Sequence, residues 1–318
     1  MHIFKYLKSS LFHLIQGDLP EYLKEEWSYY IKRKYYRTKI KRSKWWESQG
    51  GKRQELDIKI QPEVKIRLYF DSHLSRIIYE GRFEREERYF INAFLKPGDI
   101  FVDIGSNIGL FTVIAGKNVG KMGRVYSFEP AYKNYQRLLK NIELNYLKNV
   151  ESYQLAISHK KGQMAMNVSL DGFDAWNSIA QPIAGDCFEM ETIYSVKWDD
   201  FVREHNLQGK VTMMKIDVEG WESYVLSGGW ETLSRKDAPV LQVEFTEKAS
   251  QSANSSCKEV YYKLANLGYQ LFTYDSNSRK LIPETLREEY PYVNLIAVKN
   301  TEQVFARLQR GKHPRWLR

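Results

Sequence analysis

Short apolar segments alternate with segments of helical periodicity between residues 100 and 299, and no other feature of the sequence restricts the fold as strongly. Strands that alternate with helices predict a mostly parallel sheet with right-handed crossovers, so an α/β protein is expected. The expected strands span 100–104, 124–130, 150–158, 211–220, 239–247 and 292–299, and a helix that runs into a further strand spans 256–275.

The segment before residue 100 has a different pattern. Alternating stretches within 57–80, DIKI, VKIRLYF and RIIYEG, predict short antiparallel strands, and the periodicity of 83–95 predicts a helix. We therefore divide the chain into a basic, mainly helical extension over 1–60, a main domain over 61–300 and a basic tail over 301–318.

The positive net charge of +9 comes from the ends of the chain. Thirteen positive charges and no acid lie within 29–44 and 307–318, which leaves the other residues with a net charge of −4. An enzyme that acts on nucleic acid would carry positive charge around its catalytic cleft. The distribution disfavours nucleic acid as substrate and favours peripheral contact of the ends with an anionic surface or partner.

The first seventeen residues can form a helix with an apolar stripe from Ile3 to Ile15. Such a helix is either a membrane-surface anchor, helped by the nearby basic run, or a helix packed on the protein's own core. No apolar stretch is long enough to span a membrane, and the first residues make a poor signal peptide. Two cysteines cannot form a disulfide framework or a cysteine zinc site. We expect a cytoplasmic protein, with peripheral membrane contact left open.

The strongest motif is FVDIGSNIG, residues 101–109, at the end of the first predicted strand. Gly105 would let the chain turn tightly and let a ligand approach the backbone, and Gly109 would let the next helix pack close to the sheet. Glu129 ends the second strand, 20 residues past Gly109. In dinucleotide-binding folds, an acid at about this spacing binds the ribose hydroxyls.

The details of the motif indicate which nucleoside is bound. Asn107 stands where the dinucleotide fingerprint would have its second glycine, which counts against NAD. Asp103, just before the loop, would repel a phosphate but would suit a cationic ligand. S-adenosylmethionine carries an ammonium and a sulfonium and has no phosphate, so the charge favours it.

The motif resembles the nucleoside loop of class I S-adenosylmethionine-dependent methyltransferases, specifically of the FkbM family. Four stretches within roughly residues 80–298 carry the resemblance: GDIFVDIGSNIGLFT with RVYSFEP, YQLAIS, the segment around VKWDDF, and MKIDVEGWESYVLSGG with PVLQVEF. The resemblance implies a Rossmann-like sheet of seven strands with an antiparallel last strand, and O-methylation, often of sugar or other natural-product hydroxyls. The segment VKWDDF departs from the family's usual Thr-Leu-Asp run, which leaves the role of Asp199 open.

The resemblance also implies where the cofactor, S-adenosyl-L-methionine, would bind. By motif position the loop would line the methionine part, Glu129 would bind the ribose, and Ile157 would lie near the adenine. The complete expected set is Asp103, Gly105, Ser106, Asn107, Gly109, Glu129, Pro130 and Ile157.

A hydroxyl acceptor needs a general base near the methyl group. The fourth strand ends in IDVEGWE, and Asp217 and Glu219, two residues apart, are expected to face the pocket together. Two close carboxylates push one pKa upward, which suits a base near neutral pH. They could equally hold a divalent metal with Glu244, or only cap a helix and fix the Gly220 turn. We predict Asp217 and Glu219 as catalytic residues and predict no metal ligand.

Weaker candidates lie elsewhere. Glu84 could fold over the cofactor or be a solvated helix acid, and His159 is expected at the surface. The insertion around residues 171–178 is expected to lie over the acceptor pocket, where Phe173 and Trp176 could stack on a sugar ring or close a hydrophobic lid.

The expected function is therefore an S-adenosylmethionine-dependent O-methyltransferase, of class EC 2.1.1, that acts on a hydroxyl of a sugar, glycan or related natural product. Two alternatives remain. One is an N-methyltransferase of a small molecule or protein, and the other is a non-catalytic cofactor-binding scaffold anchored through its basic ends.

Overall fold

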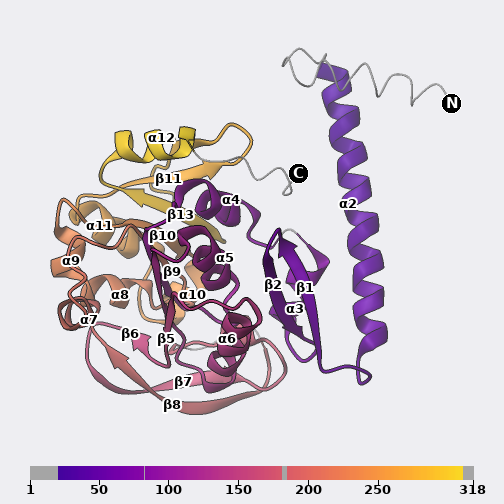
Figure 1. The fold of residues 1–318 in the computed structure, drawn as a ribbon, viewed down its shortest axis with the longest axis horizontal. Coiled ribbons are helices and arrows are strands. Elements are labelled where there is room, and N and C mark those ends of the chain that lie inside the picture. Colours follow the sequence, from indigo (N-terminus) through magenta and orange to yellow (C-terminus); the bar gives the residue numbers. More distant parts are fainter. Residues whose placement is uncertain (1–20, 82, 181–184, 311–318) are drawn as a thin grey trace.

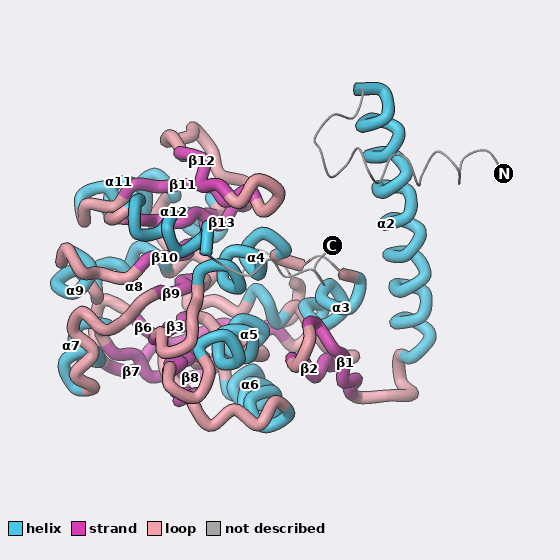
Figure 2. Tube along the Cα trace, turned by 45° about the horizontal axis from the view of Figure 1, so that its top comes forward, coloured by secondary structure: helices cyan, strands magenta, loops and turns pink. Residues whose placement is uncertain are grey.

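The fold is built on one central mixed sheet, seen in a computed structural model that describes residues 21–81, 83–180 and 185–310 (Figures 1 and 2). The sheet has eight strands. In spatial order they are β12 (Lys280–Pro283), β11 (Gln270–Asp275), β13 (Val293–Val298), β10 (Val240–Phe245), β9 (Met213–Ile216), β3 (Ile100–Ile104), β4 (Arg124–Phe128) and β5 (Val150–Tyr153).

The topology confirms the predicted class I methyltransferase fold. Strands β10, β9, β3, β4 and β5 run parallel, while β13 runs antiparallel to both of its neighbours, β10 and β11. The strand order reverses between β3 and β9, which is where open α/β sheets bind ligands. The short strand β12 pairs with β11 at the edge and makes eight strands where seven were expected.

Two apolar cores cover the two faces of the sheet, because successive strand residues point to opposite faces. Phe101 and Met213 belong to one core, and Val102 and Met214 belong to the other. The first core includes α4 (Arg85–Phe94), α5 (Leu110–Val119) and α12 (Thr301–Arg310). The second includes α7 (Trp198–Glu204), α8 (Glu222–Gly228), α9 (Trp230–Ser234) and α11 (Cys257–Asn266), while α6 (Tyr132–Leu144) contacts α5 and α10 (Glu247–Ser252) follows β10.

A second, three-stranded sheet lies beside the carboxyl ends of the central strands and consists of β6 (Ala156–Ile157), β8 (Phe188–Val196) and β7 (Gly162–Ser169). The prediction of one strand over 150–158 was wrong, because β5 stays in the central sheet while β6 leaves it to pair with β8. The hairpin β7–β8 and the short 3₁₀ helix η1 (Asp174–Trp176) form the insertion over the site.

The N-terminal hairpin is confirmed, with β1 (Glu55–Gln61) antiparallel to β2 (Val64–Tyr69). The strand predicted over RIIYEG was wrong, because residues 73–80 form helix α3 (His73–Glu80). The Ser72 side chain caps this helix by accepting a hydrogen bond from the Ser75 backbone, and Leu74 and Ile78, four residues apart, are both buried. The predicted helix over 83–95 is α4.

The long basic helix α2 (Glu21–Gln49) extends away from the domain in Figure 1 and contacts it near its C-terminal end. Trp46 is buried there, with its ring 4.2 Å from that of Phe70. Arg33, Arg37 and Lys41 are exposed. The predicted apolar stripe over residues 3–15 lies outside the described residues. None of the described helices is both long enough and apolar enough to cross a membrane.

Asp199, whose role the sequence left open, caps a helix other than its own. Its carboxylate accepts hydrogen bonds from the backbone N–H groups of Glu231 and Thr232, at 3.0 and 2.8 Å. These are donors in the first turn of α9, whose own N-cap is Gly229 and has no side chain.

Replacing Asp199 by alanine is expected to lower the free energy of unfolding by about 1 kcal/mol, as loss of a helix cap does. The neighbouring Asp200→Ala is the matched control, because Asp200 pairs with exposed Arg203, a contact worth roughly 0–0.5 kcal/mol. Urea unfolding of both variants measures the difference, and equal losses would show that the cap is not needed.

Candidate functional site

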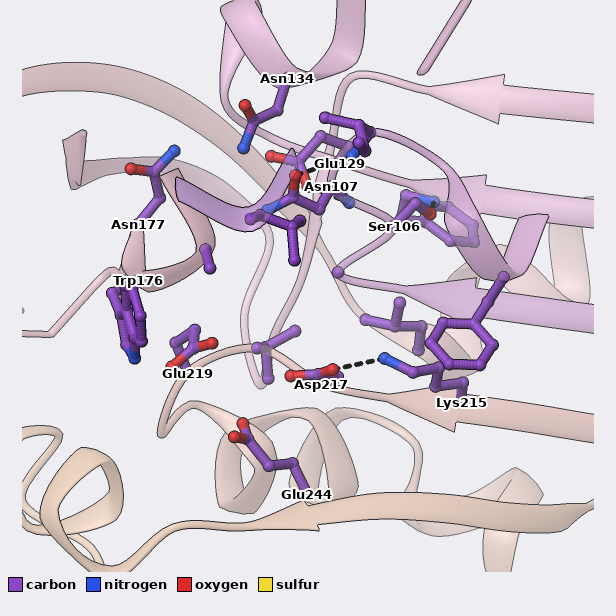
Figure 3. A pocket seen from close by; sticks show the side chains of 18 of the residues that line it. Ser106, Asn107, Glu129, Asn134, Trp176, Asn177, Lys215, Asp217, Glu219 and Glu244 are labelled. Carbon is purple, nitrogen blue, oxygen red and sulfur yellow. Dashed lines mark hydrogen bonds and ion pairs between the residues drawn. The ribbon is translucent and has the colours of Figure 1, made fainter. Parts of the chain in front are cut away.

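A cavity of about 460 Å³ opens at the carboxyl ends of β3, β4, β9 and β10, at the point where the strand order reverses (Figure 3). Its size lies within the range of small-molecule sites. Eight of the ten residues predicted for the site line it: Gly105, Ser106, Asn107, Glu129, Pro130, Ile157, Asp217 and Glu219.

The loop after β3 is held against the loop after β9. Gly105 has φ +82°, and a Cβ at this position would collide with the carbonyl of Asp217. The backbone N–H groups of Gly105 and Ser106 both donate to the carbonyl of Phe128, at the end of β4. Only glycine therefore fits where these two loops cross, at Gly105 and Asp217, as the motif predicts. Gly109, also at positive φ, lies outside the cavity and lets α5 approach Leu138 of α6.

Glu129 is buried at the rim of this loop, and its carboxylate is fixed by two backbone donors. Oε2 accepts from the Asn107 N–H at 2.8 Å, and Oε1 accepts from the Ala131 N–H at 3.0 Å. Burial raises the pKa of Glu129 to about 8. Each carboxylate oxygen keeps a further lone pair for a ligand hydroxyl.

Asp103 does not line the cavity. Its carboxylate accepts a 2.6 Å hydrogen bond from the Thr112 hydroxyl of α5. Burial raises its pKa, and Lys215 partly offsets this. Asp103 therefore lies beneath the loop and is not one of the cavity walls.

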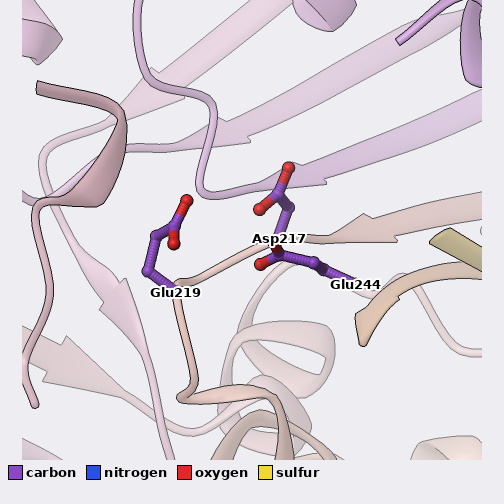
Figure 4. A group of neighbouring side chains, drawn as sticks. All are labelled: Asp217, Glu219 and Glu244. Atoms are coloured by element: carbon purple, nitrogen blue, oxygen red, sulfur yellow. The ribbon is translucent and has the colours of Figure 1, made fainter. Parts of the chain in front are cut away.

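Asp217, Glu219 and Glu244 converge on the opposite side of the cavity (Figures 3 and 4). One oxygen from each carboxylate lies within 4.8 Å of the others. The expectation that Asp217 and Glu219 face the site together is correct, but strand alternation is not the cause. Strand β9 ends at Ile216, and Glu219 lies in the following loop with a left-handed φ of +52°.

Two groups that the sequence did not reveal shape this loop. Glu222 accepts hydrogen bonds from the backbone N–H groups of Val218 and Gly220, at 3.0 and 3.3 Å, and Ser178 donates to the carbonyl of Glu219. The only sequence signal for Glu222 is its place directly after IDVEGW. Such a clamp offsets a left-handed non-glycine residue, whose cost is roughly 1–3 kcal/mol.

The electrostatics of the site are dominated by acids. Burial, followed by the charge of a neighbouring acid, raises the pKa of Glu219 and that of Glu244 well above the usual range. Lys215 forms a buried ion pair with Asp217. Burial opposes its charge, but the nearby carboxylates outweigh this, above all that of Asp217, so its pKa is raised.

The remaining walls come from segments far apart in the chain. Asp174, Trp176 and Asn177 of the insertion line the cavity, whereas Asp171 does not. Glu84, from the start of α4, also lines it and accepts a 3.0 Å hydrogen bond from Tyr292. Burial raises the pKa of Glu84 to about 8. Phe173 and His159 are outside the cavity, stacked against His73 and packed against Tyr224 respectively.

Comparison with known protein families identifies the family of this chain. The family model of the methyltransferase FkbM domain matches residues 103–271, just over half of the chain. The chain belongs to the FkbM methyltransferase family. This confirms the predicted family and its methyltransferase domain.

Individual relatives of this FkbM-family chain are more distant. It is 30% identical to Methyltransferase 1 of Beauveria bassiana (strain ARSEF 2860) over 151 residues, which cover 42% of this chain and 59% of that protein. Among solved structures, methyltransferase FkbM from Methylobacillus flagellatus KT is 17% identical, with a TM-score of 0.39, over 63% of this chain and 44% of that one. M. jannaschii TYW2 in complex with AdoMet is 16% identical, with a TM-score of 0.39, over 78% and 85% of the two chains.

The Gly105 crossing generates a stability prediction. We expect Gly105→Ala to lower the free energy of unfolding by at least about 2 kcal/mol more than Gly98→Ala, because overpacking against the backbone adds to the cost of a positive φ. Gly98 is the matched control, since it has φ +93° and a Cβ added there would meet nothing within 4 Å. Urea unfolding measures both variants, and similar losses would contradict the crossing.

Proposed function

We propose that this methyltransferase acts on a hydroxyl of a sugar, glycan or related natural product. The observation that carries the proposal is the group of carboxylates across the cavity from Asn107 and Glu129 (Figure 3). A hydroxyl must lose its proton as it is methylated, and a carboxylate beside it can accept that proton. A neutral amine needs no such base, so the carboxylates favour O-methylation over N-methylation.

The cavity fits S-adenosylmethionine, which supplies the methyl group when bound. Its loop wall exposes backbone at Gly105, and the buried carboxylate of Glu129 is oriented to accept hydrogen bonds from two ribose hydroxyls. Ile157, 1% exposed, and Pro130 offer an apolar wall for the adenine. On this proposal Glu129 binds the ribose, and the loop from Gly105 to Asn107 contacts the methionine part.

The acceptor would occupy the end of the cavity that holds the carboxylates. Trp176 and Trp221 both line the cavity, and aromatic faces of this kind suit the apolar faces of a sugar ring. Asp217 and Glu219 are the proposed base residues. Of the two, Glu219 is the freer, because Asp217 is paired with buried Lys215.

The basic ends supply a second, weaker element of the proposal. The exposed basic side chains of α2, among them Arg33, Arg37 and Lys41, support peripheral contact with an anionic surface of a cytoplasmic membrane. None of these three residues lines the cavity, whose walls come from residues 74 onward, and this supports a role in placement of the enzyme and not in recognition of nucleic acid.

Glu129→Gln is expected to weaken binding of S-adenosylhomocysteine by roughly 10- to 100-fold, since a hydrogen bond to a charged group contributes about 1.5–3 kcal/mol. Isothermal titration measures the affinity, with exposed Glu143→Gln as the control. Retention of full affinity by Glu129→Gln would remove the ribose assignment.

The raised pKa of Glu129 also predicts that ligand binding depends on pH. Burial raises the pKa of Glu129 to about 8, and hydroxyls that donate to the carboxylate favour its ionised form. Affinity for S-adenosylhomocysteine should therefore rise as pH increases from 6 to 8, on the order of tenfold, and level off above 8. Titrations across this range should show the rise in the wild type and a flatter profile in Glu129→Gln. A flat wild-type profile would contradict the assignment.

Glu219→Gln tests the base. We expect kcat to fall by roughly 10²- to 10⁴-fold, the usual range for loss of a general base, while affinity for S-adenosylhomocysteine stays within about twofold. Asp217→Asn is a poorer test, because it would leave Lys215 buried without its partner. Turnover is measured on a glycan or natural-product acceptor found by screening for methyl gain. Unchanged kcat in Glu219→Gln would exclude Glu219 as the base.

A further inference from the structure

The cavity is lined by more carboxyl groups than its own cationic side chains can pair with. Glu84 and Glu87 line it from α4, and Asp217, Glu219 and Glu244 line it from the loop after β9 and from β10. Lys215 is the only cationic side chain among the described residues that line it, and it is already paired with Asp217. Buried carboxylates without partners are costly, so a group of this kind indicates a bound cation or retained protons.

Three of these carboxylates have the spacing of a metal site. One oxygen each from Asp217, Glu219 and Glu244 lies within 4.8 Å of the other two. Oxygens that share an ion lie roughly 3–4 Å apart around Mg²⁺ and up to about 5 Å apart around Ca²⁺, because the metal–oxygen distances are about 2.0–2.1 and 2.3–2.6 Å. Figure 4 shows the three side chains arriving from two different segments and pointing toward one another.

Glu244 supplies a separate observation that points to a ligand. Its side chain is 5% exposed and reaches into the cavity from β10. Oε1 accepts a 2.9 Å hydrogen bond from the Thr246 hydroxyl. No hydrogen-bond donor among the described residues reaches Oε2. A buried carboxylate oxygen without a hydrogen-bond donor is rare in folded proteins, and a bound cation would satisfy it.

The donor set indicates which cation would bind. All three side chains offer carboxylate oxygen, and the nearby described residues offer no thiolate or imidazole. Oxygen-only sets select the hard ions Mg²⁺, Ca²⁺ and Mn²⁺. Three protein ligands suit Mg²⁺ or Mn²⁺ better than Ca²⁺, because Mg²⁺ keeps several positions for water or substrate oxygens whereas Ca²⁺ takes about six to eight ligands. We propose that Asp217, Glu219 and Glu244 form a binding site for one Mg²⁺ or Mn²⁺ ion.

The metal site would extend the proposed function, and its role in methyl transfer rests on that proposal. An ion held by one oxygen of each carboxylate would bind an oxygen of the acceptor and hold it beside the cofactor half of the cavity, and the second oxygen of Glu219 would remain available to accept the acceptor's proton. Acceptors with two neighbouring hydroxyls, as sugars have, could bind through both oxygens. Lys215 would remain the fixed partner of Asp217 and would keep one carboxylate oriented in the absence of the ion.

The experiment measures binding of Mn²⁺ to the metal-free full chain by electron paramagnetic resonance, which detects the free ion. We expect one Mn²⁺ per chain, displaced by excess Mg²⁺. Glu244→Gln and Glu219→Gln should each weaken Mn²⁺ binding by at least about tenfold, the minimum effect that altered metal surroundings produce. Asp237→Asn is the control, because Asp237 is an exposed acid paired with Arg235, and it should bind Mn²⁺ as the wild type does.

The melting temperature of each metal-free variant shows whether it still folds, independently of Mn²⁺ binding. Glu244→Gln removes a buried acid that has no cationic partner among the described residues, so its metal-free melting temperature should equal or exceed that of the wild type. Its affinity for S-adenosylhomocysteine should stay within about twofold. Mn²⁺ should raise the melting temperature of the wild type by more than that of the variant. Equal Mn²⁺ affinity in the wild type and both glutamine variants would overturn the site, as would no saturable binding in the wild type below millimolar Mn²⁺.

The two proposals fail in different ways. Methyl transfer to a hydroxyl that persists in EDTA, together with no Mn²⁺ binding, would leave the proposed function intact and overturn the metal site. Saturable Mn²⁺ binding that is lost in both glutamine variants supports the site even if no hydroxyl acceptor is ever methylated.

Discussion

The backbones of two loops cross at the centre of this protein with no space for a side chain between them. Gly105, after β3, lies against the carbonyl of Asp217, after β9. The crossing brings the loop that faces Glu129 and the loop that carries Asp217 and Glu219 to opposite walls of one cavity. The reversal of strand order creates the opening, and the absence of a side chain at Gly105 lets its walls be polar backbone on one side and acids on the other.

This arrangement places polar and ionisable side chains in the buried interior of the sheet, where water cannot screen them. Asp103, Lys215 and Gln242 occupy aligned positions on β3, β9 and β10, so polar side chains run across the buried face of the sheet beneath the site. Lys215 is buried between acids and against the ring of Phe111, at 4.7 Å. A core of this composition is less stable than an apolar one of equal size, and such a cost is typical of positions retained for chemistry.

The sequence predicted the parts of the structure that depend on local pattern. The strand over 100–104, the glycine turn and the acid at 129 follow from an apolar run, two glycines and a fixed spacing, and the structure contains all three. The prediction failed where the structure depends on contacts between segments that are distant in the sequence. Residues 150–158 split because β6 finds a partner in β8, about forty residues further on.

The same limit applies to the site. The two carboxylates of IDVEGWE were found from their sequence, but Glu219 faces the cavity through a left-handed turn clamped by Glu222, which no periodicity reveals. Asp199 was left without a role because its partners are the first-turn amides of α9, thirty residues away. Glu84 was only a weak candidate because its entry into the cavity depends on a left-handed residue at the start of α4.

The walls of the cavity belong to two different stretches of the chain. Leu74, Ile77, Phe83 and Glu84 precede residue 103, where the match to the family model begins, whereas Gly105 and Glu129 fall within that match. Substitutions in α3 and at the start of α4 can therefore reshape one wall of the cavity while the loop after β3 and Glu129 stay unchanged. The shape of that wall can therefore change in evolution independently of the loop after β3 and of Glu129.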